Sequence, residues 1–318
     1  MLGRVRGMSL FSLRSLDEHA AWLRGYLRGR GIVPAPGSAF DVALKRVDRL
    51  GRLAQSPPRQ PLPDDEFMKL SRDAFGIDFL VETLRKAERW LDTISPEVLR
   101  VYRSRDVNLM HHGRGSKDRN VAWEILVGAL CSAFARDVAL DEPDVRCRIG
   151  QSRWGLAAKV LYSSDPARHV QRIVEGAKQI ENADVDLGLV ALNASTLVPH
   201  DKFFRPLPGG RVTFFEDPAV PVRMLAEFAS AFINEIVRRR VVERLTQDRH
   251  GVARVKTRGV LLFLQTLTNL RGVFAPLTVA HFFRFREIDC GEQQFCLRFN
   301  RAAQGQGFAP ATPHWAPR

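Results

Sequence analysis

The stretch EPDVRCRIGQSRWGLAAKVLYS, residues 142–163, decides the fold of this 318-residue chain. It holds two short runs typical of β-strands, 144–149 and 154–162. The second run is apolar apart from Lys159, which follows Ala157 and Ala158. A lysine inside an apolar strand is costly to bury, so we expect Lys159 to be functional. The alternative is a charged residue that protects an edge strand from pairing with other chains.

Periodic patterns extend from this stretch in both directions. Residues 120–136 are predicted to form a helix, and 138–140 a short strand. Asp165-Pro166 starts a second helix, predicted for 166–182, with Pro near the first helical position. Residues 187–192 are predicted to be a further buried strand. The order α-β-β-β-α-β predicts an α/β (α+β) fold with a mixed sheet flanked by helices.

The flanking segments differ in composition from this core. Before it the pattern is mainly helical, interrupted by a Pro-rich stretch, and after it the pattern is helical or mixed. The last residues are rich in Gly, Ala and Pro. We therefore expect an N-terminal helical region (1–110) with a linker near 56–63, an α/β core (111–205), a mainly helical or mixed C-terminal region (206–300) and a disordered tail (301–318).

The charge balance favours an anionic partner. The chain has 48 Lys and Arg against 35 Asp and Glu, a formal net charge of +13. A field of that sign attracts nucleic acid or an anionic membrane surface. Forty of the 48 cations are Arg, however, and a GC-rich genome alone produces that skew. The Arg excess is therefore either functional or compositional.

Cysteine usage and hydropathy indicate where the protein works. Four cysteines without a CxxC pair argue against a zinc ribbon or a disulfide framework, and they fit a reducing compartment. No apolar stretch reaches the ~20 residues that span a bilayer. The first 16 residues are basic, as in some mitochondrial presequences, but lack the apolar segment of a secretory signal. We expect a cytoplasmic protein without a membrane partner.

One set of polar residues indicates a chemistry. Asp144 opens a predicted strand, and Lys159 lies 15 residues later on the next one. Glu124 lies on the preceding predicted helix, and Gln179 on the following one. A carboxylate at a strand start can hold a divalent metal, and a neighbouring Lys can reach the same phosphate and the attacking water. Mg²⁺ suits this because it binds through one or two carboxylates plus substrate oxygens.

These residues resemble the PD-(D/E)xK superfamily of nucleases, which have the restriction-endonuclease-like fold. The resemblance covers roughly residues 113–200 and is carried by GRGSKDRNVAWE (113–124), EPDVRCRI (142–149), WGLAAKVLYS (154–163) and VEGAKQIENADVDLGLVAL (174–192). It implies that Glu124, Asp144 and Lys159 are active-site residues. Gln179 resembles a Gln frequent in the RecB-like branch. The implied function is metal-dependent hydrolysis of phosphodiester bonds, in DNA, for restriction, repair or defence.

The chain departs from the family pattern at one position. The family has (D/E)-x-K, whereas this chain has Ala157-Ala158-Lys159. Either the protein is a degenerate member that binds nucleic acid or a protein partner, or the carboxylate has moved. Some members of the superfamily supply this acid from the next helix, where Glu175 lies one turn before Gln179. The expected Mg²⁺ or Mn²⁺ ligands are then Asp144 with Glu124 and Glu175.

Two basic segments are candidates for nucleic-acid binding. Lys117 lies in a Gly-rich segment just before a predicted helix, where backbone amides can contact phosphates. Arg238, Arg239 and Arg240 open a basic segment that extends to residue 258 and could follow a DNA backbone. The alternative is a solvated helix end, which favours cations through the helix dipole. A homodimer is compatible with the sequence, and so is a scaffold whose Arg content is only compositional.

Overall fold

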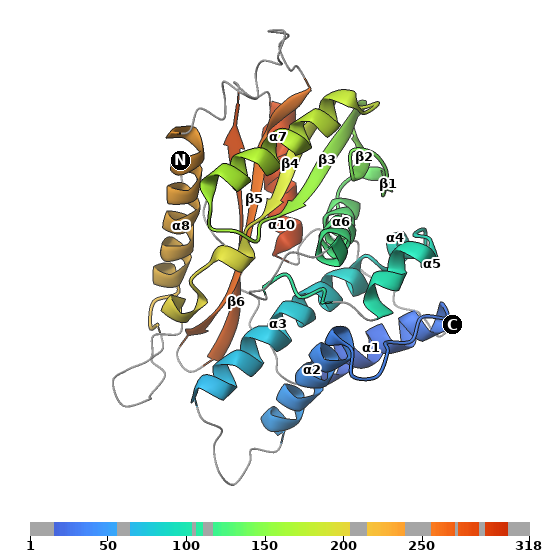
Figure 1. The fold of residues 1–318 in the computed structure, drawn as a ribbon, viewed down its shortest axis with the longest axis vertical. Coiled ribbons are helices and arrows are strands. Elements are labelled where there is room, and N and C mark those ends of the chain that lie inside the picture. Colours follow the sequence, from blue (N-terminus) through green and yellow to red (C-terminus); the bar gives the residue numbers. More distant parts are fainter. Residues whose placement is uncertain are drawn as a thin grey trace, which may run out of the picture.

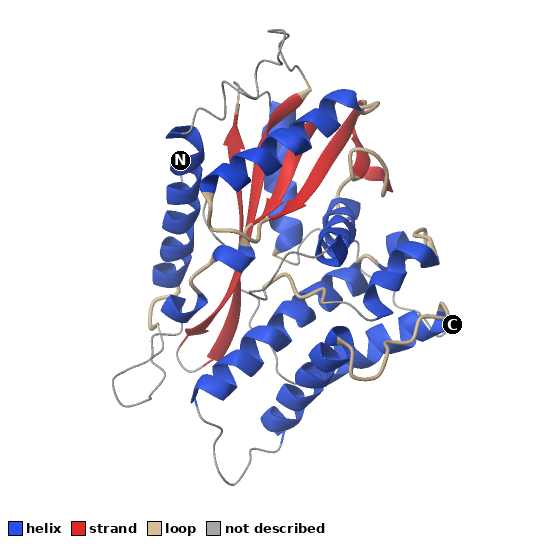
Figure 2. Cartoon of the chain, viewed as in Figure 1, coloured by secondary structure: helices blue, strands red, loops and turns tan. Residues whose placement is uncertain are grey.

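A computed structural model of the chain shows one mixed sheet flanked by helices on both faces (Figures 1 and 2). It describes residues 16–55, 64–103, 106–110, 117–203, 215–238, 256–270, 273–285 and 290–304. The helices are α1 (Leu16–Gly29), α2 (Ala39–Gln55), α3 (Asp64–Lys86), α4 (Glu88–Leu91), α5 (Pro96–Leu99), α6 (Lys117–Ser132), α7 (Pro166–Asn182), α8 (Ala219–Arg238) and α10 (Cys290–Ala303), with the 3₁₀ segments η2 (Arg100–Arg103), η3 (Ser195–Leu197) and η4 (His200–Phe203). In these ranges no helix is both long and apolar enough to cross a membrane.

The sheet has six strands in chain order. They are β1 (Arg136–Ala139), β2 (Val145–Ile149), β3 (Ser152–Val160), β4 (Leu187–Asn193), β5 (Thr257–Leu270) and β6 (Val273–Arg284). The first three strands pair antiparallel, β3 pairs parallel with β4 and β4 with β5, and β6 returns antiparallel along β5. The predicted order of helices and strands from α6 to β4 is therefore confirmed, with ends shifted by a few residues.

Alternating side chains of β3 and β4 enter two different cores. Leu156 and Ala158 pack in the core that also holds α6, the N-terminal helices and α10. Ala157 packs in the second core, with α7 and α8. Strands covered on both faces are apolar throughout, as parallel strands usually are. On such a strand a charged side chain can reach solvent or a polar partner only near the end of the strand or at a gap between the covering helices. Lys159 lies near the end, one residue before the last residue of β3.

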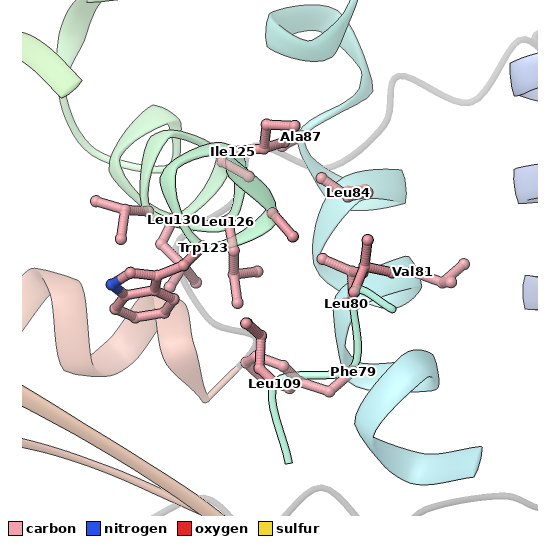
Figure 3. Close-up of a cluster of buried hydrophobic side chains, with 14 of the residues drawn as sticks. Phe79, Leu80, Val81, Leu84, Ala87, Leu109, Trp123, Ile125, Leu126 and Leu130 are labelled. Atoms are coloured by element: carbon pink, nitrogen blue, oxygen red, sulfur yellow. The ribbon is translucent and has the colours of Figure 1, made fainter. Parts of the chain in front are cut away.

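The N-terminal helices are part of the main core. Figure 3 shows Leu80 and Leu84 of α3 facing Leu126 of α6. The ring of Phe79 lies 5.9 Å from that of Phe263 on β5. The indole of Trp90 donates a 2.9 Å hydrogen bond to the carbonyl of Val138 on β1. The described residues 16–55 and 64–103 are mainly helical, and apolar side chains of α1 to α4 are buried in the same cluster as those of α6 and the sheet.

The C-terminal region, predicted to be mainly helical or mixed, is mixed in its described part. Between α8 and α10 lie β5 and β6, which are 14 and 12 residues long and extend the central sheet. The apolar run 259–270 is compatible with a buried helix or a buried strand, and pairing with β4 decides for the strand. The linker near 56–63 and most of the predicted tail, 305–318, lie outside the described residues.

Candidate active site at the start of β2

Asp144 and Lys159 form a close ion pair. Asp144 immediately precedes β2, and the register, with Val145 opposite Leu156, places it beside Ala157 on β3. Its Oδ2 accepts a 2.6 Å hydrogen bond from Nζ of Lys159 and a 2.7 Å hydrogen bond from the backbone N–H of Ala158. The two side chains are only 15% and 12% exposed. The strand hairpin thus fixes an acid and a base in one orientation.

Burial controls the protonation of Asp144. Its pKa is raised above the ordinary Asp value because desolvation outweighs the opposing effects of Lys159 and the Ala158 amide. The charge of Glu142 adds to the increase. Burial therefore has a larger effect on the Asp144 carboxylate than the ion pair and the amide donor together.

Glu124 supplies a second carboxylate near this pair. It lies on α6, which is anchored to the sheet by a 2.9 Å hydrogen bond from the indole of Trp123 to the carbonyl of Ala191. The pKa of Glu124 is raised to about 7, chiefly by burial and also by the charge of Asp144, while the charge of Lys159 opposes the increase. These three side chains therefore interact electrostatically, although 35 residues separate Glu124 from Lys159.

The two carboxylates open onto an acidic cavity of about 650 Å³. One side is formed by α5 and η2, another by α6, and the third by the loop between β1 and β2. Its described acidic lining residues are Glu97, Asp118, Glu124, Asp141, Glu142 and Asp144, beside the basic Arg100 and the apolar Val98, Val101, Val121 and Leu140. A cavity with this balance of charge favours cations over bare phosphates.

Ala157, two residues before Lys159, lies where a larger side chain has no room. The Ala157 side chain is fully buried. Above it, a Cβ added to Gly176 of α7 would lie 3.1 Å from the Ala157 Cβ and 3.0 Å from Cγ1 of Val190. The helix thus approaches β3 so closely at this point that small residues are needed on both sides.

Glu175 and Gln179 lie one turn apart on α7, so they share one side of the helix. Glu181 contacts the start of β5, where it accepts a 2.8 Å hydrogen bond from the N–H of Thr257. Residues two apart on a helix point in nearly opposite directions, so Gln179 faces the other way. Its Oε1 is buried and has no hydrogen-bond partner among the described residues.

The Glu175 carboxylate does not join the Asp144–Lys159 pair, contrary to the sequence-based expectation. It is 40% exposed and accepts hydrogen bonds from Nε2 of Gln171 at 2.9 Å and from Nη1 of Arg172 at 3.0 Å. Both partners are on its own helix. The charges of Lys159 and Glu142 act on Asp144, and the charges of Asp144 and Lys159 act on Glu124.

The predicted nucleic-acid contacts are placed only in part. Lys117 is exposed at the first residue of α6, next to Asp118 of the acidic cavity. Arg238 ends α8, and its side chain is not described. Arg239 and Arg240 lie outside the described residues. The structure therefore leaves Lys117 as the predicted cation nearest the cavity.

The donor set fits Mg²⁺ or Mn²⁺ through two carboxylates. Across the described ranges, no group of three or more His, Cys, Asp or Glu side chains could hold a metal ion. Two oxygen ligands suffice for Mg²⁺, which keeps several waters and takes further oxygens from a substrate phosphate. Asp144 and Glu124, which both line the acidic cavity, are the two carboxylates that would hold such an ion.

Sequence reasoning missed part of the cavity wall. Asp141 and Glu142 lie within three residues of Asp144 in the sequence Asp141-Glu142-Pro143-Asp144, and this cluster of acids is a signal. Glu97 had no comparable signal because α5 reaches the cavity only through tertiary packing. Comparison with protein-family models, curated proteins and solved structures gives no match. The chemistry of the site therefore rests on its own geometry.

Proposed function

We propose that this protein is a metal-dependent nuclease that hydrolyses phosphodiester bonds in DNA, with a restriction-endonuclease-like core of the PD-(D/E)xK type. One observation carries the proposal: Asp144 is bonded to Lys159 and shares an acidic cavity with Glu124. The strand directions support it, because an antiparallel β1-β2-β3 unit followed by a parallel β4 fits the order that this family implies.

Each residue has a distinct role in this reaction. Asp144 and Glu124 would hold Mg²⁺ or Mn²⁺, which lowers the pKa of a bound water and neutralises charge that develops on the phosphate. Lys159 donates from Nζ to a phosphate oxygen or to the attacking water. The Ala158 N–H fixes the orientation of the Asp144 carboxylate. Gln179, whose Oε1 is buried without a hydrogen-bond partner among the described residues, would orient a water or the substrate.

Cleavage of linear, circular and single-stranded DNA with Mg²⁺ or Mn²⁺ tests the proposal. Asp144→Asn, Glu124→Gln and Lys159→Gln should each reduce the rate by about 100-fold or more, since each removes a group from the reacting centre. Glu175→Gln is the matched control, because it neutralises an acid of α7 that is bonded within its own helix. Full activity in Glu124→Gln together with loss in Glu175→Gln would reverse the assignment of the second carboxylate.

A second function has its own support. Ala157 stands where the family has an acid, and Lys159 already neutralises Asp144. A degenerate member of the family that only binds nucleic acid or a protein partner fits both observations. Wild-type protein that binds DNA but cleaves none of the three substrates with either metal would favour this function over the nuclease.

A further inference from the structure

Arg119 is a buried cation in the first turn of α6. The residue is only 3% exposed, and arginine is seldom buried to that extent unless it is paired. Its Nη2 donates a 2.6 Å hydrogen bond to Oδ2 of Asp106, which lies in the segment before α6. Taking a guanidinium out of water costs free energy that one ion pair need not repay, so stability alone is a weak reason for this arrangement.

The same guanidinium lies over an aromatic ring just after the end of β3. Its Cζ is 5.5 Å from the centroid of the Tyr162 ring, which is within the range of cation–π attraction. The Tyr162 hydroxyl donates a 3.3 Å hydrogen bond to Oδ1 of Asn120, the next residue of α6. Arg119 and Asn120 thus hold the first turn of α6 against the residues that follow β3.

These contacts join the two elements that carry Glu124 and Lys159. Tyr162 comes three residues after Lys159, and Glu124 comes about one helical turn after Asn120. The next anchor of α6 is Trp123, whose indole donates to a carbonyl of β4. Glu124 therefore directly follows two points at which α6 is fixed to the sheet and its connections.

Glu124 depends on its helix for its position. Among the described residues, no hydrogen bond or ion pair holds its carboxylate, whereas two donors orient the carboxylate of Asp144. A shift of α6 relative to β3 would therefore move Glu124 away from Asp144 and Lys159. A displacement of about 1 Å at a reacting centre is enough to cost a large part of the rate.

We infer that Arg119 is a positioning residue of the proposed active site, which holds Glu124 where it and Asp144 would bind Mg²⁺ or Mn²⁺. The chemistry of this inference rests on the proposed function. Arg119 is buried and is not among the described residues that line the acidic cavity, so it does not touch the ion or the substrate. It acts through the first turn of α6, as the residues behind a metal ligand usually do.

The decisive experiment compares two glutamine variants that each break one Arg–Asp ion pair. Arg119→Gln breaks the pair with Asp106 and removes the charge over Tyr162. The control, Arg24→Gln, breaks the pair with Asp48, which joins α1 to α2. The dissociation constant of Mn²⁺ is measured from the electron paramagnetic resonance signal of the free ion, and urea denaturation measures the stability of each variant.

Arg119→Gln should weaken by about 10-fold the Mn²⁺ binding that Asp144→Asn abolishes. Arg24→Gln should bind Mn²⁺ within about twofold of the wild type, because it lies on other helices. Arg119→Lys keeps a cation beside Asp106 and Tyr162, so it should recover most of the affinity. If Arg119→Gln unfolds more easily in urea but binds Mn²⁺ as the wild type does, Arg119 supports only the fold and the inference is wrong.

Tyr162→Phe provides the test if Arg119→Gln does not fold. It removes only the hydroxyl that bonds to Asn120, and the ring stays under the guanidinium. The loss of this one hydrogen bond should weaken Mn²⁺ binding by about threefold. Unchanged binding in a folded Tyr162→Phe would then overturn the positioning role.

Two measurements separate this inference from the nuclease proposal. A wild type that binds Mn²⁺ through Asp144 but cleaves no DNA would contradict the nuclease, and the affinity of Arg119→Gln for Mn²⁺ would still decide the positioning role. If the wild type cleaves DNA and Arg119→Gln does so with the same dependence on Mn²⁺ concentration, only the positioning role is wrong. A wild type that binds no Mn²⁺ at this site would also overturn the inference, because Glu124 would then have no ion to hold.

Discussion

Glu124 lies where a carboxylate is costly to ionise. Its pKa is raised to about 7 chiefly by burial, and the described residues offer it no hydrogen bond or ion pair. Asp144, in contrast, accepts hydrogen bonds from two donors on one carboxylate oxygen. The two acids therefore differ near neutral pH. Asp144 is paired with Lys159, whereas Glu124 is partly protonated.

The raised pKa predicts how stability depends on pH. Between the ordinary value of 4.5 and about 7, the folded protein holds a proton on Glu124 that the unfolded chain releases. The free energy of unfolding should therefore fall as pH rises through this window. Glu124→Gln removes the charge, so it should be more stable than the wild type at pH 8 by about 1–3 kcal/mol, allowing for partial solvent access.

Urea denaturation of both proteins without divalent metal, at pH 4.5 and pH 8, measures this difference. The two proteins should have similar stability at the lower pH, where Glu124 is protonated in the folded state and half protonated in the unfolded chain. Glu175→Gln serves as the control, since its carboxylate is exposed. A wild type that is more stable than Glu124→Gln at pH 8 would show that a favourable partner holds Glu124 ionised.

At the residue scale, the sequence reveals a site residue where a charged side chain occupies a position that packing would give to an apolar one. Lys159 in an apolar strand and Asp144 at a strand start both stand out, and the structure pairs them. Glu175 shows the limit: a polar stripe fixes the flank of a helix, but only the partners Gln171 and Arg172 show where the carboxylate points. Glu97 reaches the cavity by tertiary packing, which no local pattern reveals.

At the element scale, α7 joins two parallel strands and is held at both ends. Asp165 caps its first turn through a 2.9 Å hydrogen bond from the N–H of Ala167, and Pro166 starts the helix. In its middle, Gly176 lets the helix approach Ala157 and Val190. The contact sets the height of α7 above β3, and with it the position of Gln179 relative to Asp144.

Gly176→Leu should separate the helix from the sheet. A leucine side chain has no room against Val190 and Ala157, so we expect a loss of about 1–3 kcal/mol in the free energy of unfolding. Lys178→Leu, at an exposed position of the same helix, should change it by less than about 0.5 kcal/mol. Urea denaturation measures both, and equal stability of the two variants would show that the close approach is not needed.

Element types were largely predictable from periodicity, and element partners were not. The alternating and helical patterns of 120–192 identify α6, β2, β3, α7 and β4 because each buries one or two well-defined faces. The sequence alone does not determine whether the residues of β5 form a strand, because a continuous apolar run fits a buried helix as well as a buried strand. Its pairing with β4 is a contact between distant segments, which local sequence does not encode.

At the scale of the whole molecule, the N-terminal helices and the α/β core share one buried cluster. The contacts of Phe79 with Phe263, and of Trp90 with Val138, join segments that a sequence-based boundary at residue 110 would separate. Removing α1–α3 would expose the apolar face of α6, including Leu126. The two parts should therefore depend on each other for folding.

A chain that begins at residue 111 should consequently fail to form a cooperative structure. Exposing a face of several buried Leu, Ile and Phe side chains costs about 1.5–3 kcal/mol for each, which exceeds the stability of most domains. Thermal denaturation followed by far- and near-ultraviolet circular dichroism should show no cooperative transition for the truncated chain and a single one for the full chain. A sharp transition in the fragment would establish 111–318 as an independent domain.

The order of the strands also has a consequence for synthesis. β4 is complete at Asn193, but its parallel partner β5 begins only at Thr257, about 60 residues later. At roughly 5–20 residues per second, β5 follows β4 after about 3–12 seconds of translation. During that interval the N–H and C=O groups along one edge of β4 lack the partner that β5 supplies, and they can pair with another nascent chain. Slower elongation between the two strands should therefore increase aggregation, and a chaperone that covers such an edge should raise the yield of native protein.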